Sequence, residues 1–305
     1  MKRKLIIILG PTAVGKTDYS IETALRYDSP VISCDSRQIY KEMSIGTAVP
    51  SMEQLQTVKH YFIHSHTVTQ LYTAGKYELE ALDLINRLFD EGHETLVMAG
   101  GSGFYVDALV NGLDDFPEAD LQLRSELTER LKSEGVESLR RELCKLDPES
   151  YSTIDIANGQ RVVRALEVCI MTGRPFSSFK TSPNRKRDFE IEKIGLTRPR
   201  EVLYDRINRR VLQMIDQGLV EEVRSLTQYR DLAALQTVGY KEIFDWFDYE
   251  AGLVSAEGWT PNTPGDGPVT SRDRAVELIQ RNTRHYAKRQ LSYWGRDKSI
   301  RWLTL

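Results

Sequence analysis

Short apolar runs alternate with amphipathic segments along the first hundred residues. The runs at residues 5–9, 30–34 and 95–99 are rich in apolar and β-branched side chains, which is typical of buried parallel strands. Between them, residues 17–27 and 77–91 are helix-like. The apolar stripe of the second segment comprises Leu79, Leu82, Ile85, Leu88 and Phe89. Strands alternating with helices predict a parallel sheet with helices on both faces.

The pattern changes after Pro117, where charged amphipathic helices follow one another from about residue 120 to 171. Breaks are expected near Gly135, Pro148 and Gly159. Further on, the pattern predicts a strand at 190–197, a helix at 200–229 broken at Gly218, a basic helix at 271–294 and a last strand at 299–303. The expected organisation is a core domain of residues 1–117 and 190–305 that contains an all-helical insertion, residues 118–189.

One further segment, residues 251–270, has the sequence "AGLVSAEGWTPNTPGDGPVT". It is rich in Gly, Pro and Thr and has no periodicity, so we expect a surface loop there, without an assigned role.

Composition narrows the class of protein. The chain has 305 residues, 40% of them hydrophobic, and no apolar run approaches the ~18 residues of a membrane span. Cys34, Cys144 and Cys169 are odd in number and lack metal-site spacing, which favours reduced thiols in a cytoplasmic protein. A net charge of −3 argues against a surface coated in positive charge, although residues 180–187 and 281–289 could form a local basic face.

The sequence "GPTAVGKT", residues 10–17, follows the first predicted strand and precedes the first predicted helix. This spacing and context indicate an ATP-binding-type phosphate loop, or P-loop. Its glycines let backbone N–H groups turn toward one anion, and the helix N-terminus adds partial positive charge. Lys16 would reach the outer phosphate, and the Thr17 hydroxyl would bind Mg²⁺. The expected fold class is therefore α/β, a P-loop-type parallel sheet flanked by helices with an inserted all-helical subdomain.

A magnesium-holding carboxylate is missing from the place where ATP-driven machines usually carry one. The strand at 95–99 runs into Gly100-Gly101-Ser102-Gly103, with no acid after it. Asp35, at the end of the second strand, could serve instead, so ATP use stays open. Ligands of parallel sheets gather at the carboxyl ends of strands, where Gly10, Asp35 and Gly100 all fall.

Six segments together resemble the tRNA dimethylallyltransferases, the bacterial-type tRNA isopentenyl (prenyl) transferases, over nearly the whole chain. They are "GPTAVGKT" (10–17), "DSRQIYKEMSIGTAVP" (35–50), "GGSGFYVDAL" (100–109), "NGQRVVRALEV" (158–168), "LQTVGYKE" (235–242) and "YAKRQLSYW" (286–294). The resemblance implies a cytoplasmic enzyme of tRNA modification that uses Mg²⁺. It would transfer the dimethylallyl group of dimethylallyl diphosphate to the exocyclic amine of the adenosine 3′-adjacent to the anticodon in tRNA, and release diphosphate.

The resemblance also assigns roles to residues. Asp35 would be the catalytic base. The diphosphate-binding residues would be Gly10, Pro11, Thr12, Ala13, Val14, Gly15, Lys16, Thr17 and Arg206. The tRNA-binding residues would be Asp35, Ser36, Arg37, Gln38, Ser102, Arg124, Gln160, Arg161, Val162, Val163 and Arg164. Ser102 stands where the family usually has Thr, and Tyr204 where it often has His. A monomer without membrane contact is expected.

Three alternatives remain open. A small-molecule kinase would use the loop for ATP but leaves the segments at 35–50 and 158–168 unexplained. A non-catalytic RNA-binding protein would bind tRNA whatever stood at position 35. Prenylation of free adenine nucleotides would need no macromolecular acceptor, whereas the helical insertion favours one.

Overall fold

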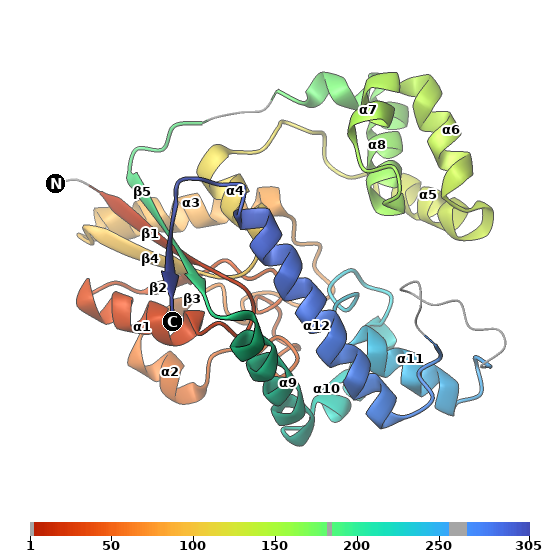
Figure 1. Ribbon diagram of the computed structural model, residues 1–305. Helices are drawn as coiled ribbons and strands as arrows, with labels where there is room; N and C mark the ends of the chain where they lie inside the picture. Colours follow the sequence, from red (N-terminus) through yellow and green to blue (C-terminus); the bar gives the residue numbers. More distant parts are fainter. Residues whose placement is uncertain (1–2, 182–184, 256–266) are drawn as a thin grey trace. The chain divides into compact units, whose positions relative to one another are not determined.

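The structure is a computed structural model, and it describes residues 3–181, 185–255 and 267–305 (Figure 1). The chain divides into two compact units. We call residues 1–110 and 186–305 the core unit, and residues 111–185 the inserted unit. The sequence placed the insertion at 118–189, so the two divisions differ by a few residues at each end.

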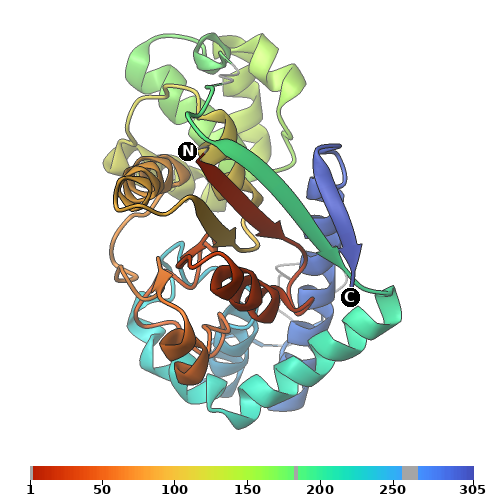
Figure 2. The ribbon, with the colours of Figure 1, turned by 90° about the vertical axis from the view of Figure 1, so that its left-hand side faces the viewer.

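The core unit is built on one six-stranded sheet in the order β3-β2-β4-β1-β5-β6, and every pair of neighbours is parallel. The strands are β1 Lys4–Leu9, β2 Val31–Ser33, β3 His60–Tyr61, β4 Thr95–Ala99, β5 Glu190–Thr197 and β6 Ile300–Thr304. Figure 2 shows β1, β5 and β6 side by side, although they come from the beginning, the middle and the end of the sequence. The predicted α/β fold class with a parallel sheet is confirmed.

Helices cover both faces of this sheet. They are α1 Lys16–Arg26, α2 Met52–Thr57, α3 Ala74–Asp90, α4 Gly103–Asn111, α9 Arg200–Asp216, α10 Leu219–Ser225, α11 Lys241–Glu250, α12 Arg272–Trp294 and the 3-10 turn η2 Thr227–Tyr229. Side chains of β1 alternate between two clusters: Leu5, Ile7 and Leu9 pack in a cluster with α3, α10 and α11. Ile6 and Ile8 pack with α1 and α9. Successive side chains of a strand point to opposite faces of the sheet, and here both faces are covered by apolar side chains, so β1 is a continuous apolar run.

Most of the predicted elements of the core lie within a residue or two of their expected bounds. The exception is α3, which begins at Ala74 instead of residue 77. The predicted stripe of this helix is also partly wrong, because Leu79 is 70% exposed. The buried face runs instead through Tyr77, Ala81, Leu84 and Leu88. The short elements α2 and β3, and helices α4 and α11, were not predicted from periodicity.

The inserted unit contains α5 Leu121–Glu134, α6 Val136–Leu146, α7 Pro148–Thr153, α8 Gly159–Thr172 and the 3-10 turn η1 Phe176–Phe179. The expected breaks are confirmed. Gly135 separates α5 from α6 at φ 77°, a left-handed value that favours glycine. Pro148 opens α7, where its missing N–H costs nothing. The unit has its own core, which includes Leu127, Leu143 and Leu166.

Within the ranges that the structure describes, no helix combines the length and the apolar character that crossing a membrane requires. The loop predicted at 251–270 falls largely on residues 256–266, which lie outside the described residues.

Candidate active site

The phosphate loop leaves β1 at Gly10 and enters α1 at Lys16. Gly10 has φ 151° and packs so closely on β5 that a Cβ there would lie 2.7 Å from the Leu196 carbonyl oxygen. Gly15 has φ 112° and caps α1 without a side-chain hydrogen bond. The first turn of α1 therefore keeps its backbone N–H groups and its partial positive charge for an anion.

Four side chains from the other half of the core unit hold this loop in place. Arg198 Nε donates to the Val14 carbonyl at 2.8 Å, and Arg206 Nε donates to the Ala13 carbonyl at 2.8 Å. Arg210 and Gln290 both contact Thr12. The Arg210 guanidinium lies 3.3 Å from the Thr12 hydroxyl, and the Gln290 carbonyl accepts the Thr12 N–H at 2.9 Å. Arg206 thus lies on the loop, as the sequence comparison implied, rather than in a surface salt bridge.

The ammonium of Lys16 folds back over the loop. Its Nζ donates to the carbonyls of Gly10 at 2.9 Å and Pro11 at 2.8 Å. The pKa of Lys16 is lowered to about 8, mainly by burial; the Asp35 charge partly opposes this shift, and the nearby Arg210 charge adds to it. Burial also lowers the pKa of Arg210. Burial disfavours the charged forms of both side chains, and a bound anion would stabilise these charged forms.

Asp35 lies just beyond the carboxyl end of β2, facing this cluster of cations. One carboxylate oxygen, Oδ1, accepts the backbone N–H groups of Arg37 at 2.8 Å and Gln38 at 3.3 Å, as in an Asx turn. The other oxygen, Oδ2, has no hydrogen-bond partner among the described residues. Asp35 therefore shapes its own loop with one oxygen and keeps the other for a ligand.

Ser36 and Ser102 join the ends of β2 and β4. The Ser102 hydroxyl accepts the Ser36 N–H at 2.9 Å and donates to the Ser36 hydroxyl at 2.9 Å. Gly100 permits this approach, because a Cβ there would lie 2.5 Å from the Cys34 carbonyl carbon. The glycine-rich end of β4 thus lies directly against the segment that begins with Asp35.

Two hollows meet at the loop. An open cleft of about 860 Å³ is lined by Lys16, Thr17, Asp35, Gln38, Arg206 and Gln290, among others. Beside it, a smaller cavity of about 120 Å³ shares Thr12, Ala13, Asp35 and Arg210 with the cleft. Its other walls are mainly apolar and include Ile207, Val211, Met214, Val238 and Ile279. An anion held by the loop would lie next to an apolar chamber.

For a divalent cation the site offers few protein ligands. Thr17 and Asp35 both line the cleft. Within the described ranges, no group of three or more His, Cys, Asp or Glu side chains could hold a metal. This donor set suits Mg²⁺, which usually keeps several waters and takes only one or two protein oxygens beside those of a phosphate ligand.

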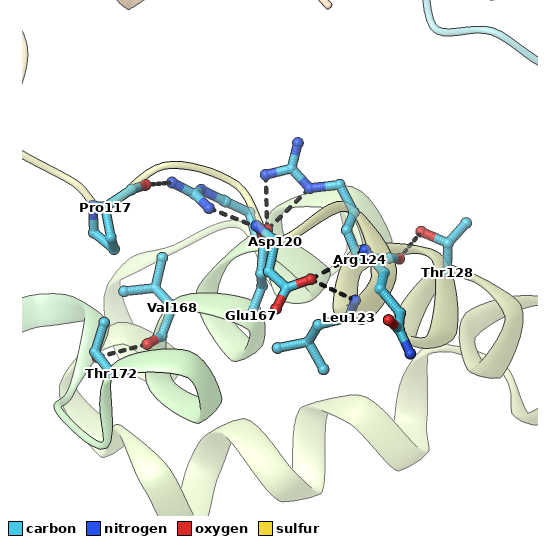
Figure 3. A network of polar contacts seen from close by, with 10 residues as sticks. Pro117, Asp120, Leu123, Arg124, Thr128, Glu167, Val168 and Thr172 are labelled. Atoms are coloured by element: carbon cyan, nitrogen blue, oxygen red, sulfur yellow. Dashed lines mark hydrogen bonds and ion pairs between the residues drawn. The ribbon is translucent and has the colours of Figure 1, made fainter.

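Predicted tRNA-contacting residues of the inserted unit converge on one carboxylate. Glu167, which is fully buried, accepts from Arg124 Nε at 2.9 Å and Nη2 at 2.7 Å (Figure 3). It also pairs with Arg164 Nη1 at 3.0 Å and accepts the Asp120 N–H at 3.0 Å. Arg164 donates in addition to the Pro117 carbonyl at 2.8 Å. About 30% of each arginine side chain stays exposed.

The remaining predicted residues of α8 separate by burial. Gln160 and Arg161 are exposed, and Arg161 has only a weak ion pair to Asp155 at 3.9 Å. Val162 and Val163 are 0% and 1% exposed and belong to the core of the inserted unit. The assignment of this segment to tRNA contact stays a prediction, and its exposed side chains, Gln160 and Arg161, are the ones that can reach RNA without a change in packing.

Sequence reasoning missed three residues of the site. Arg210 lies on Thr12 and lines both hollows. Gln290 also donates to the Gly101 carbonyl at 2.9 Å, so it ties the loop to the end of β4. Tyr286 lines both hollows as well. Gln290 and Tyr286 fall in the segment "YAKRQLSYW", which was a usable signal. The signal for Arg210 is its position four residues after Arg206, on the same face of α9.

Comparisons with known proteins agree on one family. A family profile described as IPP transferase matches residues 38–297. The chain is 44% identical to tRNA dimethylallyltransferase 1 of Bacteroides thetaiotaomicron over 98% of this chain and 90% of that protein. It is 43% identical to the tRNA dimethylallyltransferase of Christiangramia forsetii, over 99% and 93%.

Solved structures give the same picture. The full-length tRNA isopentenylpyrophosphate transferase of Bacillus halodurans superposes with a TM-score of 0.67 at 35% identity, covering 99% of this chain and 90% of that one. A eukaryotic dimethylallyltransferase acting on tRNA gives a TM-score of 0.75 at 23% identity, covering 99% and 74%, and shares the fold.

Proposed function

The chain belongs to the IPP transferase family, and we propose that it transfers the dimethylallyl group from dimethylallyl diphosphate to tRNA, as a tRNA dimethylallyltransferase. The acceptor is the exocyclic amine of the adenosine 3′-adjacent to the anticodon, and diphosphate is released. The observation that carries this proposal is the apolar cavity beside the phosphate loop. A five-carbon group attached to a diphosphate fits that arrangement, with the diphosphate on the loop and the hydrocarbon against Val211 and Ile279.

The loop stabilises the leaving group. As the carbon–oxygen bond of the donor breaks, its electron pair moves to the diphosphate oxygen. Lys16, Arg206, Arg210 and the first-turn N–H groups of α1 surround the place where this charge grows. Fixed donors of this kind act most strongly where charge develops in the transition state.

Asp35 takes the proton. The adenine amine is a weak nucleophile because its lone pair is delocalised into the ring. As the new nitrogen–carbon bond forms, the amine loses one proton to the free Oδ2 of Asp35. The contact of Oδ1 with the Arg37 N–H fixes the direction of Oδ2. General-base assistance of this type typically contributes ~10²–10⁴-fold to the rate.

Mg²⁺ would be held by the diphosphate oxygens, water and the Thr17 hydroxyl, with Asp35 in the wall of the same cleft, and it would supply further charge for the leaving group. Around the acceptor, Ser36, Arg37, Gln38 and Ser102 form the RNA-facing edge of the core unit. On the inserted unit, the exposed Gln160 and Arg161 and the exposed parts of Arg124 and Arg164 contact the RNA. A monomeric state and a cytoplasmic location stay predictions.

The test is transfer of labelled dimethylallyl diphosphate to unmodified tRNA that carries adenosine 3′ of the anticodon, in the presence of Mg²⁺. We expect the wild type to label the tRNA. Asp35→Asn, which keeps an oxygen for the Arg37 N–H, should lower the rate by ~10²-fold or more, because the base is lost. Label found only on free adenine nucleotides, or consumption of ATP without any transfer, would overturn the proposal.

A further inference from the structure

Glu222, on α10, is the acceptor for an unusual set of donors. Its carboxylate accepts three consecutive backbone N–H groups, from Ser44 at 2.9 Å, Ile45 at 2.8 Å and Gly46 at 3.0 Å. It also accepts the Tyr240 hydroxyl at 2.6 Å. Successive backbone N–H groups that point at one centre form an anion-binding concavity. Here the chain fills that concavity with a carboxylate 176 to 178 residues away in sequence.

Tyr240 closes the other side of this contact. Its ring is fully buried and packs on Gly46, where an added Cβ would lie 2.5 Å from Cε2 of the ring. Burial, and then the Glu222 charge, raise the pKa of Tyr240. The phenol therefore stays protonated and donates to Glu222. The turn at 44–46 is therefore held by the Glu222 carboxylate, which accepts its N–H groups, and by the Tyr240 ring, which packs on Gly46.

The held turn fixes a residue of the candidate site. The carbonyls of Thr47 and Ala48, just after the turn, accept Gln38 Nε2 at 3.2 and 2.9 Å. A carbonyl can only accept, so these two contacts settle which end of the Gln38 amide is the nitrogen. The other end, Oε1, has one long hydrogen bond among the described residues, 3.5 Å from the Ser33 hydroxyl. Gln38 therefore offers a hydrogen-bond acceptor in the cleft that also contains Asp35.

We propose that Glu222 is a positioning residue for the RNA acceptor: through the 44–48 turn it orients Gln38 so that Oε1 accepts from an amino group of an RNA base. The proposal deepens the tRNA prenyl transfer of the preceding section and rests on it. Glu222 itself touches neither substrate. Its loss should disturb recognition of the RNA and leave the diphosphate-binding side chains in place, because Lys16, Arg206 and Arg210 have no contact with the 44–46 turn among their hydrogen bonds in the described chain. Gly46 and Thr47 also line the apolar cavity, so the diphosphate alone is the ligand that separates the two sites.

The test compares Glu222→Gln with Glu221→Gln, its exposed neighbour on the same helix. The first change keeps the shape but removes the charge and replaces one acceptor by a donor, which leaves at least one backbone N–H of the turn unpaired. We expect the KM for tRNA to rise about tenfold. The kcat and the Kd for inorganic diphosphate, which does not enter the apolar cavity, should stay within about twofold of the wild type. Glu221→Gln should match the wild type throughout.

Tyr240→Phe gives a second, milder variant, because it keeps the ring on Gly46 and removes one of the four hydrogen bonds. We expect the KM for tRNA to rise about threefold. An unchanged KM for tRNA in the folded variants overturns the proposal, as does an equal rise in Glu221→Gln. A fall in kcat at constant KM also overturns it, because it indicates loss of folded enzyme only. Failure of the wild type to label tRNA would instead overturn the function itself.

Discussion

Two groups of basic side chains in this chain differ in what balances their charge. At the phosphate loop, Lys16, Arg206 and Arg210 contact carbonyl and hydroxyl oxygens, and within the described residues none of them forms an ion pair. In the inserted unit, Arg124 and Arg164 share the buried carboxylate of Glu167.

The first group keeps its positive charge for an incoming anion. In the second group the charge is balanced by Glu167, and these ion pairs hold α5, α8 and the segment at Pro117 together. Under the proposed function, equal residue types serve the reaction in one region and hold the fold in the other, and four experiments test this difference.

The largest expected effect is at Arg210. Arg210→Gln removes a cation aimed at the leaving diphosphate, so kcat/KM should fall by ~10²–10³-fold, the usual cost of one such donor. The matched control is Arg200→Gln, an exposed residue of the same helix that lines neither hollow and whose guanidinium lies over the Tyr204 ring. Steady-state transfer to tRNA measures both variants. Equal activities in the two would contradict the assignment of the first group to chemistry.

Next comes Glu167. Glu167→Gln leaves two arginines without their shared charge, and because both are partly exposed we expect the free energy of unfolding to fall by about 2 kcal/mol. Chemical denaturation measures this value. The kcat at saturating tRNA should change little, and Glu129→Gln, at an exposed position of α5, should affect neither quantity. A large fall in kcat with normal stability would place Glu167 in the chemistry and erase the contrast.

A smaller effect is expected from pH. The free-enzyme pKa of Lys16 is about 8, so the ammonium is charged below that pH and neutral above it. A bound diphosphate favours the charged form, so binding takes up a proton above pH 8. The Kd for dimethylallyl diphosphate should therefore rise by up to about tenfold per pH unit above 8. Calorimetry between pH 7.5 and 9.5 measures this dependence, and Lys16→Met should show none of it. If the Kd of the wild type does not change with pH, the Lys16 ammonium does not bind the diphosphate.

The smallest effect is expected at Arg161, which is exposed and only loosely paired. Arg161→Gln should weaken tRNA binding a few-fold at low salt. The slope of the logarithm of the binding constant against the logarithm of the salt concentration should fall by about the value of one phosphate contact. The free energy of unfolding should change by less than about 0.5 kcal/mol. Titrations of tRNA at several salt concentrations measure this. An unchanged salt dependence would remove Arg161 from the RNA-binding face.

Local pattern predicted the strands, the phosphate loop and the helical insertion, because each depends on neighbouring residues: an apolar run, a glycine spacing, a helical period. The resemblance to a family added Asp35 and the RNA-facing segments. Short elements such as β3, with two residues, have no period to detect.

Residues that act through distant partners were missed for a different reason. Gln290 reaches Thr12 across 278 positions, and Glu222 reaches the 44–46 turn across about 177. Glu222 has no local signal that separates it from an ordinary helix side chain, and Gln290 is marked only by the segment "YAKRQLSYW" in which it lies. Val162 and Val163 show a different limit, because the resemblance marks a whole segment and does not separate its buried side chains from its exposed ones.

The most direct test of the account compares the affinities of dimethylallyl diphosphate, inorganic diphosphate and ATP for the wild-type protein with Mg²⁺. If the loop serves a prenyl donor, the hydrocarbon in the apolar cavity should make dimethylallyl diphosphate bind at least about tenfold more tightly than inorganic diphosphate, since each buried CH₂ contributes ~0.8 kcal/mol. ATP should bind more weakly than the prenyl donor. Tightest binding of ATP, with no gain from the dimethylallyl group, would contradict the account and return the loop to phosphoryl transfer.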